Sequence, residues 1–176
     1  MTCPVDEIKI RARLLCKGLD RQDTAALDRA RGVAKRQRWA VPQTWTLGLC
    51  LNVVSVEAGF DQWDHARKVL AGEAGRGSDM GRFWYDKTCW ALLNLWFASY
   101  EDARESLREC SGRYLFPYGR QYIVADGAFV QALGLDPASP GLAGIGGDLA
   151  GGYGSPAWQE QVEARLRHTR TQAARA

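Results

Sequence analysis

The chain has 176 residues, a formal net charge of +3, an apolar share of 46% and a charged share of 24%. A domain of this length buries roughly two-thirds of the surface that its unfolded chain exposes, so it folds without needing a disulfide or a metal. The apolar share excludes a chain that is disordered throughout.

The cysteine pattern is typical of a reducing compartment. The five cysteines are odd in number and form no CxxC pair, and three of them lie within apolar runs, where a free thiol packs as a small hydrophobic group. The N-terminal segment mixes acids and bases, and no window has the roughly 18 to 20 apolar residues of a membrane helix. We therefore expect a cytoplasmic protein that does not span a membrane.

Four helices are predicted in residues 1–71, which form an N-terminal helical part. Apolar residues at helical spacing place the first helix over Val5–Lys17 and the second over 24–36. A third helix is predicted over 44–59, with a Thr cap at its start, and a fourth over 61–70, with an Asp cap. The last two make a compact helical pair around which the rest of the chain is expected to pack.

Basic residues gather on the second predicted helix. Arg31, Lys35 and Arg38 share its outer face, and Arg36 and Trp39 lie beside them. Such a stripe is either a solvated face next to a core Trp, or a contact for an anionic partner in which the Trp ring stacks on a base. The four basic residues are the candidate anion contact, for a nucleic-acid or protein partner.

The composition changes after the helical pair. Residues 72–81 contain four glycines and are expected to be a linker or mobile loop before an aromatic-rich part, 82–176. A buried strand is predicted within 82–98, although the Leu and Ala content leaves a helix as the alternative. Ser99 is placed to cap a short helix, and 113–126 is predicted to be a hairpin or one bent strand.

The end of the chain is predicted to hold a short helix capped by Asp126, a Gly-rich segment and an amphipathic helix. Segment 139–156 is dominated by Gly, Ala and Pro, and we expect it to wrap the surface or to be mobile. It lacks the GK[ST] ending of a P-loop, so it does not predict phosphate binding. Trp158, Val162 and Leu166 recur at i, i+4 and i+8 and predict the final helix.

Polar residues on the predicted strands are the candidates for a pocket. Asn94 lies within an apolar run, and Tyr118, Arg120 and Tyr122 lie on a later strand. If the strands pair, these side chains converge on a pocket lined by aromatic rings, a common composition of small-molecule sites. A buried Asn94 needs hydrogen-bond partners in either case, and a bond to the backbone is the alternative explanation.

No catalytic set is recognisable. The two histidines, His65 and His168, are far apart in sequence, and no cluster of Cys and His supplies the ligands of a zinc site. The chain also lacks the GxSxG elbow and the kinase motifs. We therefore predict no metal and no cofactor, and favour a function without catalysis.

The helical pair resembles a DNA-reading unit. The segment VVSVEAGFDQWDHARKVL, residues 53–70, is similar to the helix-turn-helix of AraC-type regulators, with Gly59 and Phe60 at the turn. The resemblance implies a second helix whose first residues meet base edges in the major groove. Asp61 and Asp64 lie there, and phosphates repel them. We therefore interpret the helical pair as a structural centre. If the protein contacts nucleic acid, we expect the helix over 24–36 to make the contact.

A second resemblance covers residues 53–137. The segments AGFDQWDHAR, NLWFASYEDAR, YLFPYGRQYIVAD and LGLDP resemble a group of bacterial proteins of unknown function, in which a GFxxW helical segment precedes a small strand-helix-strand part. The resemblance implies an architecture and no activity.

Together these patterns predict an α+β protein in which an N-terminal helical bundle packs on a small antiparallel or mixed sheet with short helices. The leading functional hypothesis is a non-enzymatic binding or regulatory module. The alternative is a small enzyme or small-molecule binder that uses the pocket between the aromatic strands. A homodimer formed through the aromatic residues is a further hypothesis.

Overall fold

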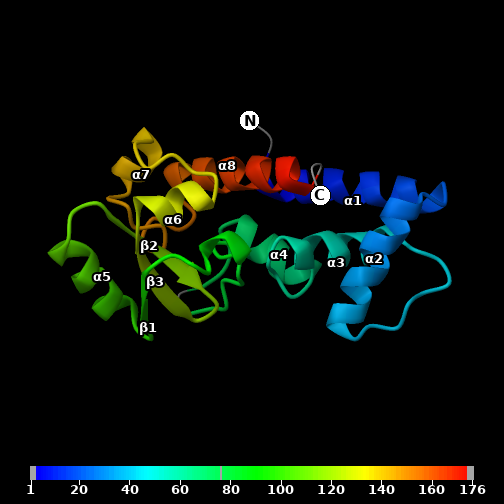
Figure 1. The fold of residues 1–176 in the computed structure, drawn as a ribbon, viewed down its shortest axis with the longest axis horizontal. Helices are drawn as coiled ribbons and strands as arrows, with labels where there is room; N and C mark the ends of the chain where they lie inside the picture. Colours follow the sequence, from blue (N-terminus) through cyan, green and yellow to red (C-terminus); the bar gives the residue numbers. More distant parts are fainter. Residues whose placement is uncertain (1–2, 76, 174–176) are drawn as a thin grey trace.

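The computed structural model describes residues 3–75 and 77–173 and has an α+β fold with an N-terminal helical region, as predicted. The molecule is elongated (Figure 1). Four helices occupy one end, and a small sheet with short helices occupies the other. The last helix runs from the sheet back to the first helix, so it connects the two ends.

The N-terminal helices follow the predicted order. They are α1 (Pro4–Asp20), α2 (Thr24–Gln37), α3 (Leu47–Glu57) and α4 (Trp63–Leu70). Asp23 caps α2 by accepting a hydrogen bond of 2.8 Å from the backbone N–H of Ala26. Gly18 does not end α1 but lies inside it. A Cβ at Gly18 would lie 3.0 Å from the Cβ of Ala26, so a glycine here lets the two helices approach closely.

The start of α3 and the start of α4 differ from the predicted caps. Thr46, not Thr44, accepts the capping hydrogen bond of α3, from the N–H of Leu49. The side chain of Asp61 does not cap α4. Instead Asn52 of α3 reaches across the pair and accepts a hydrogen bond of 3.0 Å from the N–H of Trp63. The helical pair is therefore held together by Asn52, which no local capping signal in the sequence identifies.

The turn between α3 and α4 presses against the chain that follows α4. Gly59 has a φ of +94°, and a Cβ at this position would lie 2.7 Å from the backbone carbon of Arg82. The carbonyl of Gly59 accepts a hydrogen bond of 2.7 Å from the N–H of Arg82. This close contact fixes the helical pair onto the aromatic part.

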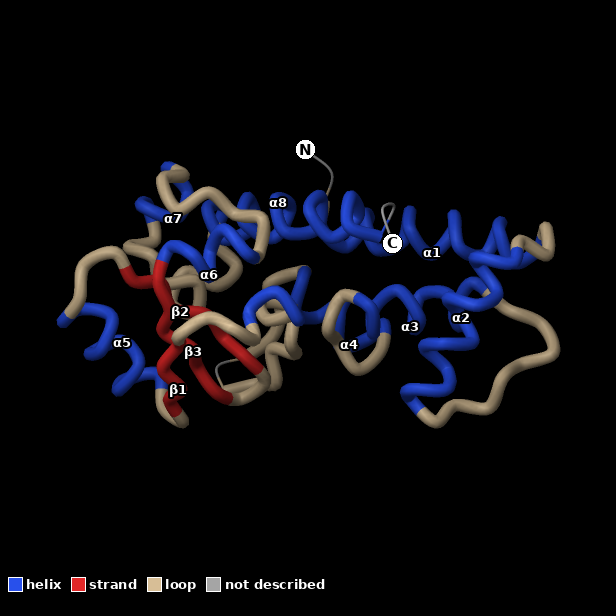
Figure 2. The backbone as a smooth tube through the Cα atoms, viewed as in Figure 1, coloured by secondary structure: helices blue, strands red, loops and turns tan. Residues whose placement is uncertain are grey.

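Three antiparallel strands form the sheet, in the order β1-β3-β2 (Figure 2). They are β1 (Asn94–Phe97), β2 (Arg113–Tyr118) and β3 (Gln121–Asp126). Of the two predicted arrangements of 113–126, the hairpin is correct, with its turn at Gly119. Ser99 caps α5 (Tyr100–Glu109), as predicted, and this helix covers one face of the sheet.

The strand predicted within 82–98 is mostly absent. Only β1 is extended, and 82–93 forms turns and the short 3₁₀ helix η1 (Lys87–Cys89). Neighbouring residues of a strand point to opposite faces, whereas Phe83 and Trp84 are both buried in one core. A turn can bury two neighbouring side chains in the same core, whereas a strand cannot. The aromatic content of this segment therefore does not indicate a strand.

The end of the chain contains α6 (Gly127–Ala132), α7 (Pro140–Gly144) and α8 (Pro156–Ala173). The predicted inner face of the last helix is correct, because Trp158, Val162 and Leu166 are buried. The Gly-rich segment before α8 is fixed to the sheet, since Leu115 donates to the carbonyl of Gly147 at 2.9 Å and accepts from the N–H of Leu149 at 2.9 Å. It closes the outer edge of β2.

One contiguous core joins the two ends of the molecule. It includes Ile8 of α1, Val53 of α3, Trp84, Ile123 of β3 and Trp158 of α8. A smaller cluster lies between α5 and the other sheet face. The division at 72–81 into a helical part and an aromatic-rich part, packed together as one folding unit, stays a prediction.

A buried arginine strengthens the junction between α8 and the aromatic part. Arg165 is 2% exposed. Its guanidinium pairs with the carboxylate of Asp86 and donates to the carbonyls of Leu133 and Phe83, at 3.1 and 3.4 Å. Burial raises the pKa of Asp86, but the hydrogen bonds from Arg165 and Thr88 and the charge of Arg165 outweigh burial, so the pKa is lowered.

Candidate functional site

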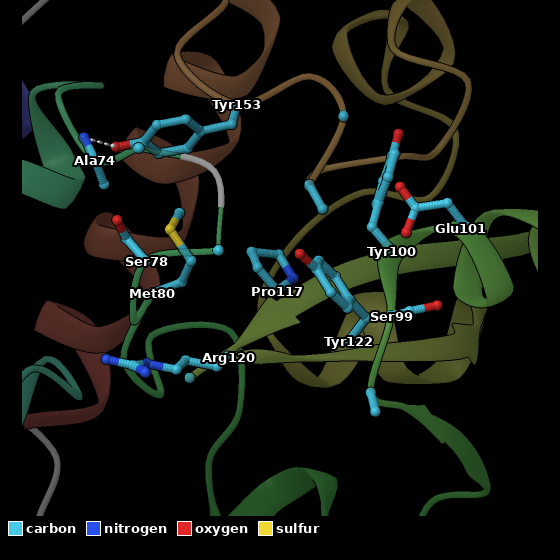
Figure 3. A pocket seen from close by; sticks show the side chains of 16 residues that line it. Ala74, Ser78, Met80, Ser99, Tyr100, Glu101, Pro117, Arg120, Tyr122 and Tyr153 are labelled. Atoms are coloured by element: carbon cyan, nitrogen blue, oxygen red, sulfur yellow. Dashed lines mark hydrogen bonds between the residues drawn. The ribbon is translucent and has the colours of Figure 1, made fainter.

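A pocket of about 560 Å³ lies between the sheet, the start of α5 and the loop that follows α4 (Figure 3). Small-molecule sites have volumes of roughly 300 to 1,000 Å³, so this pocket has a suitable size. Four segments that are distant in sequence line it. They contribute Ala74, Gly75, Gly77, Ser78, Met80, Ala98, Ser99, Tyr100, Glu101, Pro117, Gly119, Arg120, Tyr122, Ala150, Gly151 and Tyr153.

Tyr153 fixes one wall of the pocket. Its hydroxyl accepts a hydrogen bond of 3.0 Å from the N–H of Ala74 and donates to the carbonyl of Val69 at 2.8 Å. Burial raises the pKa of Tyr153, and the charge of Glu73 adds to this, while the bond from Ala74 lowers it; the net direction is upward. The neutral hydroxyl thus ties the loop after α4 to the segment before α8.

Tyr100 forms the opposite wall. Its hydroxyl donates to the carboxylate of Asp148 at 2.6 Å, and the same carboxylate accepts a hydrogen bond of 2.6 Å from the N–H of Gly151. Asp148 is 8% exposed. A Cβ at Gly151 would lie 2.4 Å from the Tyr100 hydroxyl, so only glycine leaves room for this arrangement. The ring of Tyr100 is therefore held in place by a buried acid.

The third wall is the β2–β3 turn and the segment bonded to it. Met80 donates to the carbonyl of Gly119 at 2.8 Å, and Gly119 donates to the carbonyl of Gly81 at 2.7 Å. His65 supports this segment from α4, because its Nδ1 accepts from the N–H of Asp61 while its Nε2 lies 2.8 Å from the carbonyl of Asp79. Because Nδ1 accepts a hydrogen bond, Nε2 carries the proton and donates a hydrogen bond to the carbonyl of Asp79. His65 therefore connects α4 to the segment that forms this wall.

Two opposite charges line the pocket from different sides. Figure 3 shows Arg120 at the β2–β3 turn and Glu101 at the start of α5, with Pro117 and Tyr122 between them. Both charged residues are exposed. Within the described part of the chain neither forms an ion pair, so both are available to a ligand.

The sheet divides the four predicted pocket residues into two pairs. Tyr122 lines the pocket on the α5 face, and Arg120 lines it from the turn. Asn94 and Tyr118 lie on the other face, since they pair with Ala125 and Gln121, which are three residues and one residue from Tyr122 on β3 and so point away from its face. The structure therefore brings two of the four together.

Asn94 and Tyr118 have structural partners. The side-chain amide of Asn94 donates to the carbonyl of Leu92 at 2.9 Å, which is the backbone bond given as the alternative. The ring of Tyr118 packs edge-on against Trp96 and Tyr85, with centroid distances of 5.0 and 5.4 Å. These contacts account for both side chains without a ligand.

Sequence reasoning missed Tyr100, Glu101 and Tyr153. The first two follow the predicted cap at Ser99, and the first turn of a helix is a common position for functional groups. Tyr153 is the aromatic residue within the Gly-rich segment. A large ring in a stretch that otherwise lacks bulky side chains indicates a fixed contact, which was the available signal.

The candidate anion contact is fully accessible. Arg31, Lys35 and Arg36 are exposed on α2, and Arg38 is exposed at its left-handed C-cap, with a φ of +57°. Trp39 is partly buried against the core and lines a second pocket of about 230 Å³ together with Trp45. The ring is therefore engaged with the protein beside the basic stripe.

Cys50 is shielded from solvent and holds its proton. Cys50 is fully buried, and burial together with the neighbouring Cys16 raises its pKa to about 12. Among residues 3–75 and 77–173, no group of three or more His, Cys, Asp and Glu side chains is arranged to hold a metal ion. No helix in the same residues is both long and apolar enough to cross a membrane.

Comparison with protein-family models, with curated proteins and with solved structures gave no match. The resemblances of the helical pair and of residues 53–137 stay predictions.

Proposed function

We propose that the protein is a binding module, and that its ligand is a small dipolar molecule held in the pocket between Arg120 and Glu101. The observation that carries the proposal is the pair of opposite charges on two sides of one pocket, neither of which forms an ion pair with residues 3–75 or 77–173. Catalysis forms no part of it. Cytoplasmic location also stays a prediction.

The chemistry of the two charged groups defines the ligand class. A guanidinium matches a carboxylate with two parallel hydrogen bonds, so Arg120 is suited to the acidic end of a ligand. Glu101 is suited to an ammonium group at the other end. The rings of Tyr100 and Tyr122 lie in the same pocket and offer apolar faces to the middle of the molecule. These features favour a zwitterion such as a free amino acid or a short peptide.

Hydrogen bonds that hold the walls support binding by a preformed site. The hydroxyls of Tyr100 and Tyr153 are both engaged in bonds to the protein. The walls are thus ordered before a ligand arrives, which lowers the entropy lost on binding.

The test is a thermal-shift titration of the full chain with free amino acids and dipeptides, each compared with its carboxamide. At a ligand concentration 100-fold above Kd, stabilisation is about 2.7 kcal/mol, which raises Tm by roughly 5 to 10 °C in a protein of this size. We expect this shift for at least one zwitterion, and a much smaller one for its carboxamide, which lacks the negative end.

Variants locate the site. Arg120→Gln and Glu101→Gln should each abolish the shift, while Arg108→Gln, which changes an exposed arginine of α5 outside the pocket, should leave it intact. A panel without any stabilising zwitterion, or a shift that survives Arg120→Gln, would refute the proposal.

A second proposal is an anionic partner at α2. It is supported by the exposure of all four basic residues, Arg31, Lys35, Arg36 and Arg38. Gel-shift titrations with DNA and RNA should show an affinity that falls steeply between 50 and 200 mM salt and is lost when the four are changed to Gln. Binding that is absent at low salt would remove the nucleic-acid version and leave a protein partner.

A further inference from the structure

The two edges of the sheet are treated differently by the rest of the chain. The outer edge of β2 is closed by the Gly-rich segment, through the hydrogen bonds of Leu115 with Gly147 and Leu149. The outer edge of β1, residues 94–97, makes no backbone hydrogen bond to another segment within the described part of the chain. β1 therefore presents free donors and acceptors to solvent.

The open edge lacks the charges and prolines that keep many edge strands apart, and its short length, four residues, is the one such feature it has. Natural proteins protect such strands with charges, prolines or bulges. Residues 88–100 contain no charged residue and no proline. A neutral edge with unpaired backbone groups is a template for pairing with another strand.

Apolar side chains surround this edge. Leu95 and Trp96 of β1 are each 44% exposed, and Trp90 and Leu93, on the chain leading into it, are 68% and 91% exposed. The ring of Trp96 packs edge-on against Tyr118 and Tyr85, at centroid distances of 5.0 and 5.6 Å, and remains partly exposed. Apolar residues thus gather around unpaired backbone groups, which is the combination expected of an interface.

We propose that β1 pairs with β1 of a second copy of this chain, antiparallel and across a two-fold axis, to make a continuous six-stranded sheet. A neutral strand meets its own copy without like-charge repulsion. Lys87 precedes the strand and Glu101 and Asp102 follow it. Antiparallel pairing brings the start of one strand toward the end of the other, so the acids that follow one strand face the neutral segment 88–93 of the partner and meet no like charge there.

Symmetry restricts the register. A two-fold axis perpendicular to the sheet keeps each side chain on its own face, so one residue must lie opposite its own copy. When the axis passes through the middle of β1, that residue is Leu95 or Trp96. The strand has only four residues, and small interfaces are weak. We therefore expect a dimer with Kd on the order of micromolar.

The test is sedimentation velocity on the full chain between 1 and 500 μM. The wild-type chain should shift from monomer to dimer over this range. Leu95→Lys and Leu95→Glu should each be monomeric throughout, because each places two like charges on one sheet face, at the two-fold axis or one residue from it. An equimolar mixture of the two variants should restore the dimer, which neither a fold defect nor an unrelated interface explains.

A matched control separates the edge from general surface hydrophobicity. Leu14 of α1 is 64% exposed and far from β1 in the fold, so Leu14→Lys should dimerise like wild type. If the Leu95 variants fail to fold, Leu93→Glu replaces them and should be monomeric, since a side chain that is 91% exposed has little part in folding and a negative charge there faces the acids that follow the partner strand. A wild-type chain that stays monomeric at 500 μM, or variants at Leu95 that dimerise as it does, would overturn the proposal.

Discussion

The ion pair of Asp86 and Arg165 offers a direct test of how the two ends of the molecule are joined. The change is Asp86→Asn, which keeps the shape of the side chain and removes its charge. Arg165 then remains buried, with its side chain 3% exposed, and has neutral partners in place of a carboxylate: the carbonyls of Phe83 and Leu133 and the amide oxygen of the new side chain. A buried charge that loses its counter-ion is strongly destabilising.

The expected loss in the free energy of unfolding follows from how deeply Asp86 and Arg165 are buried. Removing one member of a buried ion pair costs about 3 to 5 kcal/mol. The side chain of Asp86 is 29% exposed, so water reaches the vacated position and partly compensates. We therefore expect a loss near the lower limit, about 3 kcal/mol. With an m value of about 2 kcal/mol/M, the midpoint of urea unfolding falls by about 1.5 M.

The assay is urea unfolding at pH 7 followed by Trp fluorescence. Asp64→Asn is the control, because Asp64 pairs with Lys68 at the surface, where an ion pair adds little. Its midpoint should stay unchanged. An Asp86→Asn midpoint equal to that of wild type would refute the assignment of this pair as a stabilising junction.

The pH dependence of stability gives an independent check that the ionised form of Asp86 stabilises the fold. The folded pKa of Asp86 lies below the value of an unfolded chain, about 3.9. The unfolded state therefore takes up a proton first as the pH falls. The stabilisation by the ionised carboxylate is complete well above pH 4 and is lost as the pH falls through the folded pKa. The difference in stability between wild type and Asp86→Asn should accordingly shrink below about pH 4.

Two further predictions concern single positions. Gly59→Ala should lower the free energy of unfolding by more than about 2 kcal/mol, because it combines a positive φ with a Cβ 2.7 Å from the backbone of Arg82. Gly112→Ala has a φ of +77° and no described atom within 4 Å of the new Cβ, so it should lower this free energy by only about 1 kcal/mol. Urea unfolding measures both. With a pKa of about 12, Cys50 should resist a thiol reagent at pH 8 until the chain is unfolded, while the exposed Cys3 reacts at once; early labelling of Cys50 would show that its site opens locally.

The helices were predictable because their signals are local. The cap at Asp23 and the cap at Ser99 each lie within three residues of the N–H groups that they bind. The apolar spacing of Trp158, Val162 and Leu166 likewise identifies a buried face from one segment alone. These patterns do not depend on what the rest of the chain does.

The strand and the pocket were harder because long-range contacts decide them. Phe83 and Trp84 have the composition of a strand, but a core shared with distant helices turns the chain there. Arg120 and Tyr122 were recognised as candidates, while Asn94 was grouped with them because one sequence does not show which sheet face each strand presents. Asp148, which orients Tyr100, comes from a segment whose glycines indicate flexibility.

The pocket and the open edge share one stretch of chain, since β1 ends at Phe97 and the pocket begins at Ala98. Binding at one could alter the other only if this stretch moved. Ser99 is fixed by its capping bond to Asp102, and Tyr100 by Asp148. We therefore expect the zwitterion to bind Leu95→Lys and the wild-type chain with affinities that agree within about twofold, or roughly 0.4 kcal/mol. Calorimetric titration of both proteins measures this, and a larger difference would mean that dimerisation and ligand binding are coupled, each changing the other by the same factor.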